Sequence, residues 1–154
     1  MLDSKDCFVS FNLLEKMSSY RHISRIVAMQ TLFEYTLRKN ADAQKIIEYN
    51  HGIFADKLEN TDFLTKLVSG VIEYRLEIDR KIEKYAPEWP IEKIALVERM
   101  ILEVALFELL YTKDTPSAVI INEAVEISKT YGDDTSSKFI NGVLSTANKK
   151  LKQK

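Results

Sequence analysis

The sequence predicts an all-α fold, a compact bundle of six or seven helices. Only four glycines and three prolines occur among its 154 residues, too few for the many tight turns of a β-sandwich or β-barrel. Apolar side chains instead recur at helical spacing along most of the chain. With 45% hydrophobic residues, a chain of this length can bury one core, so we expect a single domain.

Three helices are expected in the first half of the chain. The first covers about residues 22–39, with one apolar stripe formed by Ile26, Met29, Phe33 and Leu37. A weaker helix is expected over residues 42–50. A third begins at N-cap candidates in residues 60–62. This helix either continues to Lys84 or breaks in two near Gly70, and the pattern leaves both alternatives open.

Three further helices are expected in the second half. An irregular linker, residues 86–90, precedes an apolar central helix within residues 94–111, whose four charged side chains indicate a buried helix and not a membrane span. Residues 115–116 are expected to cap and start the next helix, which ends at Gly132. Residues 133–136 cap the last helix. Its expected inward positions are Phe139, Val143, Ala147 and Leu151.

The sequence offers little to catalysis or metal binding. The single cysteine, Cys7, excludes an internal disulfide and a cysteine-based zinc site, and it fits a reducing cytoplasm. His22 and His51 are isolated, and no phosphate loop or nucleophile motif occurs. Asp133 and Asp134 are typical of a helix cap rather than an acid–base pair. We therefore expect no enzyme activity, no cofactor and no metal.

Charge is segregated along the chain although the net charge is only −1. Residues 21–39 carry +3 and residues 120–154 carry +2, whereas residues 40–119 carry −5. If the two basic segments meet in the fold, the protein has one basic face and one acidic face.

The best candidate for a binding site is the start of the first helix. Arg21, His22 and Arg25 offer cations for phosphates, and Tyr20 offers an aromatic face for a base. The alternative interpretation is an ordinary solvated helix start. A glycine inside the last helix, Gly142, predicts close approach of a second helix, because glycine there otherwise costs about 1 kcal/mol.

Four segments carry a resemblance to a known family. Residues 116–132 read PSAVIINEAVEISKTYG and residues 138–144 read KFINGVL. Residues 98–109 read ERMILEVALFEL and residues 25–33 read RIVAMQTLF. Together these segments resemble the NusB family of transcription antitermination factors, and the similarity spans about residues 20–147.

The resemblance implies about seven helices in two small helical subdomains. It also implies binding of single-stranded boxA-type RNA in ribosomal RNA leader transcripts, together with the ribosomal protein NusE. With the RNA polymerase elongation complex in the cytoplasm, these factors suppress premature termination. The residues that the resemblance marks for RNA binding are Arg21, His22, Arg25, Lys129, Tyr131, Thr135, Ser136 and Lys138.

The chain departs from the family pattern in three places. Ile23 and Ser24 interrupt the arginine run, so we expect modest RNA affinity. Glu103 stands where the family more often has arginine. Residues 1–17 are expected to be an extension, either a disordered arm or a mis-assigned start, and residues 18–154 to be the RNA-binding domain.

Two other functions stay open at this point. The chain could be a helical protein–protein interaction module with little RNA affinity, because the arginine run is thin. It could also be a remnant of the N-terminal domain of an RNA cytosine methyltransferase, which contains the same helical module. An apolar helix edge could form a homodimer as readily as it binds NusE.

Overall fold

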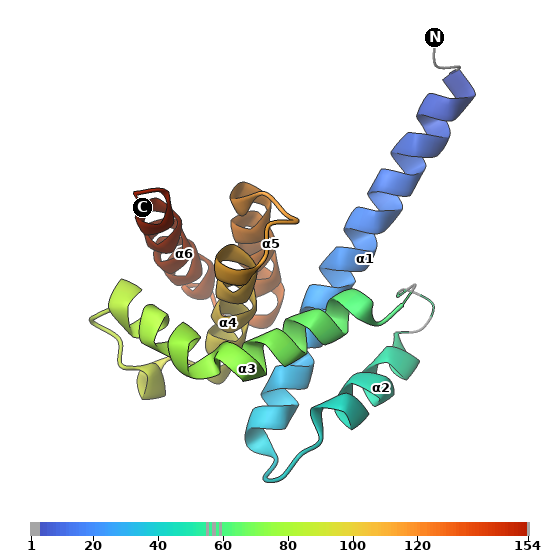
Figure 1. Cartoon of the computed structure of the whole chain (residues 1–154). Helices are drawn as coiled ribbons and strands as arrows, with labels where there is room; N and C mark the ends of the chain where they lie inside the picture. The colour runs from blue at the N-terminus through green and yellow to red at the C-terminus, as the bar shows by residue number, and fades with distance from the viewer. Residues whose placement is uncertain (1–3, 55, 57, 59, 154) are drawn as a thin grey trace.

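The protein is helical throughout the part that the structure describes. The computed structural model describes residues 4–153 except 55, 57 and 59, with side chains from residue 19 onward. Within that part it contains six α-helices, one short 3₁₀ helix and no strand. These are α1 (Ser4–Leu37), α2 (Ala43–Ile53), α3 (Asp62–Tyr85), η1 (Ile91–Lys93), α4 (Leu96–Tyr111), α5 (Ser117–Tyr131) and α6 (Ser136–Lys152) (Figure 1). The all-α prediction is confirmed, with slightly fewer helices than seven.

Helix α4 lies at the centre of the bundle (Figure 1). It packs against α1, α3, α5 and α6, while α2 packs on α1 and α3. Helices α5 and α6 pack side by side and form the largest contact between any two elements. Helices α1–α3 and α4–α6 are the two successive groups that correspond to the two expected helical subdomains. Helix α4 of the second group also packs against α1 and α3 of the first.

Helix α1 begins at Ser4, earlier than the start that its apolar spacing predicts. Its buried face is formed by Val27, Ala28, Met29 and Leu32. The expected stripe is wrong at its last member, because Leu37 is 63% exposed at the end of the helix. The expectation for residues 1–17 lies outside the described side chains, so the domain boundary stays a prediction.

Helix α3 continues without a break through Gly70 to Tyr85. An added Cβ at Gly70 would lie 2.1 Å from Cζ of the Phe107 ring on α4. Gly70 therefore permits the close approach of α3 and α4. The same role was expected of Gly142, but a Cβ there would meet nothing within 4 Å. That expectation is wrong, since the outer side of α6 is open at this position.

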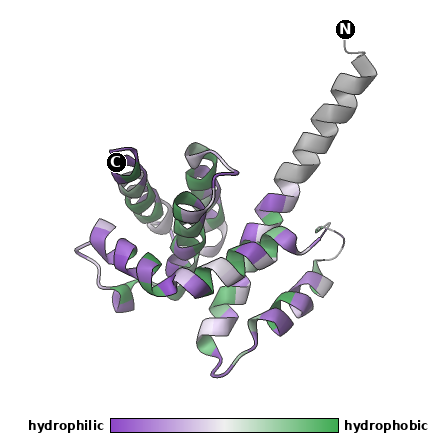
Figure 2. Cartoon of the chain, viewed as in Figure 1, coloured by the Kyte–Doolittle hydropathy of each residue, from purple (hydrophilic) through white to green (hydrophobic). Residues whose placement is uncertain are grey.

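Helix α4 is buried on every side along Met100–Glu108, and its ribbon is largely hydrophobic (Figure 2). An all-round apolar helix is stable in water only when neighbours cover it completely, and the four surrounding helices do so here. Among the described residues, no helix is both long and apolar enough to cross a membrane. Two of the buried α4 side chains are carboxylates, Glu103 and Glu108, and each needs a partner.

Glu103 finds its partners in two arginines. Its Oε2 accepts a bond of 2.9 Å from Arg75 Nη2 on α3, and its Oε1 accepts one of 3.2 Å from Arg99 Nε on α4. Arg99 also donates to Asp79. Burial is the main cause that raises the pKa of Glu103, to about 7. The Arg75 guanidinium lowers this pKa, and the nearby Asp79 carboxylate raises it. The unusual acid at this position is therefore balanced by basic side chains on both helices.

This cluster predicts a pH dependence of stability. Because the pKa of Glu103 in the folded state exceeds its ordinary 4.5, the protonated carboxyl stabilises the fold below pH 4.5. That contribution is lost as the pH rises through 7. The free energy of unfolding of the wild type relative to Glu103→Gln should fall between pH 5 and pH 8 in urea titrations. The exposed Glu126→Gln variant is the control and should show no such trend. A difference for Glu103→Gln that stays constant with pH would contradict the prediction.

Candidate nucleic-acid interface

Arg21 lies where α1 meets the loop before α5. Its Nη1 donates a 3.0 Å hydrogen bond to Thr115 Oγ1, and its guanidinium lies 4.7 Å from the centroid of the Phe63 ring. Thr115 was expected to cap α5, but Pro116 takes that position and leaves the threonine hydroxyl to accept from Arg21. Arg21 is half-buried, and Thr115 accepts from one of the five N–H donors of its guanidinium. After the Lys66 ammonium, Arg21 also helps to lower the pKa of the exposed Asp114 carboxylate. The guanidinium is thus held in place with donors to spare for an anion.

His22 pairs with α5 through its Nδ1, which lies 2.7 Å from Glu123 Oε2. The histidine side chain is 37% exposed and the glutamate 19%. Glu123 also accepts from Arg25 Nη1 at 3.5 Å. One carboxylate therefore ties the start of the predicted basic helix face to α5.

Arg25 does not offer its guanidinium to solvent, which corrects the expectation that it contacts phosphate directly. It is 5% exposed and makes two bonds to Glu108 of α4, from Nε at 2.7 Å and from Nη2 at 3.0 Å. The physical reason is that Glu108, 1% exposed, needs a buried cation. Arg25 therefore positions α1 on α4. Sequence reasoning missed Glu108, although a carboxylate within an apolar helix was the available signal.

The loop between α5 and α6 is organised by Asp133. Its Oδ1 accepts from the backbone N–H groups of Thr135 and Ser136 and from both hydroxyls. The Thr135 hydroxyl holds the pKa of Asp133 below its usual range. These bonds show that Asp133 helps to cap α6, although the N-cap position itself is Thr135, whose side chain makes no capping bond.

Ser136 is buried at 1% exposure, and its hydroxyl also donates to Glu98 at the start of α4. This corrects the expectation that Ser136 faces RNA, because its hydroxyl is already used in tying α6 to α4. The other marked residues around this loop are exposed, namely Lys129, Tyr131, Thr135 and Lys138. Lys129 pairs with Glu126 on its own helix at 2.9 Å.

The marked residues thus form two patches, which we call the helix patch and the loop patch. The helix patch consists of Arg21 and His22, and the loop patch consists of Tyr131, Thr135 and Lys138. Next to the helix patch, Arg25 bonds Glu108, and next to the loop patch, Ser136 bonds Glu98. These two glutamates are ten residues apart on α4, so the patches are separated by roughly 15 Å along this helix, at about 1.5 Å per residue. Helix α5 connects them.

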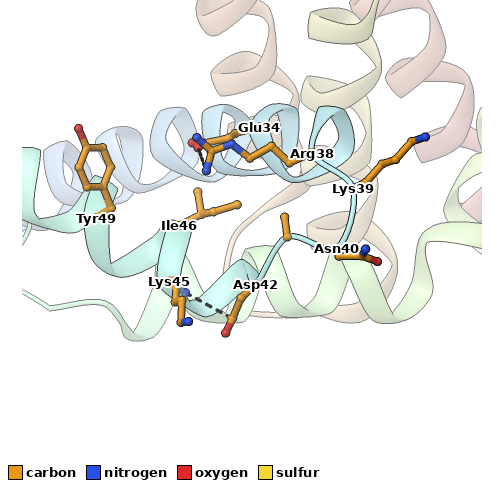
Figure 3. A pocket seen from close by; sticks show the side chains of 9 residues that line it. Glu34, Arg38, Lys39, Asn40, Asp42, Lys45, Ile46 and Tyr49 are labelled. Carbon is orange, nitrogen blue, oxygen red and sulfur yellow. Dashed lines mark hydrogen bonds and ion pairs between the residues drawn. The ribbon is translucent and has the colours of Figure 1, made fainter.

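A third basic surface lies at the other end of α1 (Figure 3). Arg38, Lys39 and Lys45 line an open hollow between α1 and α2. Arg38 is paired with Glu34 at 3.0 Å, and Asp42 caps α2. Arg38 follows Arg21 by 17 residues, which is roughly 25 Å along a helix. This hollow is therefore separate from both patches and serves below as a control.

The described side chains show no group of three or more histidine, cysteine, aspartate or glutamate residues that could hold a metal ion. The carboxylates at the two patches are engaged by arginine, histidine or hydroxyl partners. The described residues form six packed helices with half-buried cations at the helix patch and with an exposed lysine and exposed hydroxyls at the loop patch. This arrangement defines a helical binding protein.

The chain belongs to the NusB family, whose model matches residues 22–149. The transcription antitermination protein NusB of Chloroflexus aggregans is 42% identical over 133 residues, which cover 85% of this chain and 88% of the relative. The NusB of Oceanobacillus iheyensis is 41% identical over 125 residues, covering 81% and 95%. Both relatives are transcription antitermination proteins.

Solved structures show the same fold. T. maritima NusB superimposes with a TM-score of 0.74 at 31% identity, covering 84% of this chain and 90% of that chain. A structure of antitermination factors NusB and NusE in complex with dsRNA contains a chain with a TM-score of 0.74 at 28% identity, covering 85% and 97%.

Proposed function

We propose that this protein binds boxA-type RNA of ribosomal RNA leader transcripts together with NusE, and so suppresses premature termination. Arg21 is the observation that carries the RNA part of this proposal. Its guanidinium contacts Thr115 and Phe63, and the bond to Thr115 uses one of its five N–H donors. A pre-positioned guanidinium loses little entropy when it binds a phosphate.

The proposed partners follow from charge and from the family. The NusB in one solved neighbour is bound to NusE and dsRNA. In this chain the middle segment, residues 40–119, carries −5, which suits a basic ribosomal protein and favours rapid encounter with it. We extend the proposal to the RNA polymerase elongation complex in the cytoplasm. A homodimer is the alternative use of an apolar helix edge.

Removal of the Arg21 guanidinium tests the RNA part. Arg21→Ala should weaken binding of a short single-stranded boxA-type RNA roughly tenfold, the equivalent of one charge-assisted hydrogen bond. The slope of log K against log salt should become shallower by about 0.7, one phosphate contact to a single strand. Fluorescence anisotropy with labelled RNA, with and without NusE, measures both quantities.

Arg38→Ala is the matched control, since it removes an arginine that directly follows the end of α1, at the distant hollow. It should leave affinity and salt slope unchanged. Equal losses in both variants would show that only overall charge matters, and would contradict a site at Arg21. A double-stranded RNA of the same sequence forms a second arm, because the solved neighbour holds dsRNA.

A protein–protein module without RNA affinity is the second candidate. The burial of Arg25 favours it, because only two of the three basic side chains that the sequence predicts for this face, Arg21 and His22, remain in the helix patch. If NusE binds while no salt-dependent RNA binding appears with or without NusE, this second function replaces the first.

A further inference from the structure

Trp89 is a large aromatic residue that the fold leaves uncovered. It lies in the turn before η1 and is 51% exposed. One edge rests on Phe139 of α6, with ring centroids 6.1 Å apart and an angle of 67° between the planes. The contact with Phe139 covers one edge of the indole, and about half of the side chain stays exposed to solvent. Trp89 therefore presents an exposed aromatic surface beside Phe139.

A hollow of about 350 Å³ lies beside Trp89. Its apolar side is formed by Trp89, Ile94 and Phe139. Its polar side is formed by two lysines, Thr135 and Glu98, and the Glu98 carboxylate accepts from the Ser136 hydroxyl. Lys93 comes from η1 and Lys138 from α6, and neither has an ion-pair partner among the described residues. An aromatic surface between two cations is the arrangement that binds a base together with the phosphates of its strand.

The hollow is continuous with the loop patch. Thr135 and Lys138 line it as well, so a strand that contacts them reaches Trp89 without leaving the surface. A second hollow adjoins it and contains Gly142 beside Trp89 and Phe139. Gly142 has no internal packing reason, because a Cβ there would meet nothing within 4 Å. Because Gly142 has no side chain, no atoms project from this position into the hollow beside the indole.

We infer that Trp89 is a stacking platform for one unpaired base of a single-stranded RNA, with Lys93 and Lys138 neutralising the adjacent phosphates. This inference rests on the proposed RNA-binding function and extends its path from the loop patch to η1. A stacked base is unpaired, so a duplex cannot use the platform. The two lysines favour RNA over an apolar peptide, which would leave both cations without partners.

The tryptophan itself reports on the contact, because Trp89 is the only one in the chain. Titration of the full-length protein with a single-stranded boxA-type RNA should quench its fluorescence, with the same dissociation constant as that from anisotropy. The corresponding duplex should leave the emission unchanged. A change in emission that occurs with NusE alone and not with RNA would overturn the inference and assign Trp89 to a protein interface.

Substitutions of Trp89 test whether its aromatic ring contributes to RNA affinity. Trp89→Ala should weaken single-stranded RNA binding about 5- to 150-fold, the range for loss of one base stack, and Trp89→Phe should restore most of the affinity. Tyr49→Ala is the matched control, since it removes an aromatic side chain that is 70% exposed on α2. Its affinity should equal that of the wild type.

The outcomes distinguish the inference from the function on which it rests. If the wild type binds RNA and Trp89→Ala binds it equally well, the platform is absent while the proposed function stands. If the wild type binds no RNA under any condition, both fail. Circular dichroism melts of each variant show that it is folded, which is expected because the indole is half-exposed.

Discussion

Arg25→Ala should lower the free energy of unfolding by about 3–5 kcal/mol, the usual cost of breaking a buried ion pair. The substitution leaves Glu108, 1% exposed, without the two bonds that Arg25 donates. Urea denaturation followed by circular dichroism measures the loss. Arg21→Ala, four residues earlier and half-buried, should cost less than about 1 kcal/mol because its guanidinium remains partly hydrated.

A double substitution tests the cause of that loss. Arg25→Met combined with Glu108→Leu removes both charges and fills the space, so it should recover most of the stability that Arg25→Ala loses. If the double variant is no more stable than the single one, the loss comes from packing and not from an unpaired charge. Any RNA-binding defect of Arg25→Ala must therefore be assessed only where the variant is folded.

Gly70→Ala should destabilise the protein by about 1–3 kcal/mol, as expected for overpacking in a core. The new Cβ would lie 2.1 Å from the Phe107 ring, which is buried and cannot swing away freely. Phe107→Leu in the same chain should recover part of the loss by removing the contacted ring atoms. Thermal and urea denaturation of both variants measure the effect.

Gly142→Ala is the natural comparison, because both glycines lie inside helices. With open space at its Cβ position, this substitution should stabilise the fold by up to about 1 kcal/mol through helix propensity. The prediction that Gly70 and Gly142 respond with opposite signs fails if both substitutions destabilise the protein.

The helical architecture could be predicted because local patterns determine it. Local patterns indicated all six helices, although α1 begins at Ser4 and not near residue 22. Gly132 marked the end of α5 correctly. The pattern could not decide between one helix and two at Gly70, since a glycine in a helix is compatible with either. The decision depends on Phe107, which lies 37 residues away in the sequence and contacts Gly70 only in the folded chain.

The candidate site was less accessible to sequence reasoning. A spacing of four residues places Arg21 and Arg25 on one face of α1. It does not reveal that α4 covers Arg25 and leaves Arg21 half-buried. The sequence pattern identifies Trp89 only as part of the linker over residues 86–90. Its exposure is a property of how η1 meets α6, and no local pattern encodes that contact.

The position of α4 also determines how the protein opens. Since α4 touches α1, α3, α5 and α6, its amide protons can exchange with solvent only when the whole bundle opens. Helix α2 rests on α1 and α3 and can separate without disturbing the others. Both patches are anchored to α4 through Glu108 and Glu98. A ligand on either patch should therefore slow amide exchange along the entire central helix and leave α2 exchanging at its own rate.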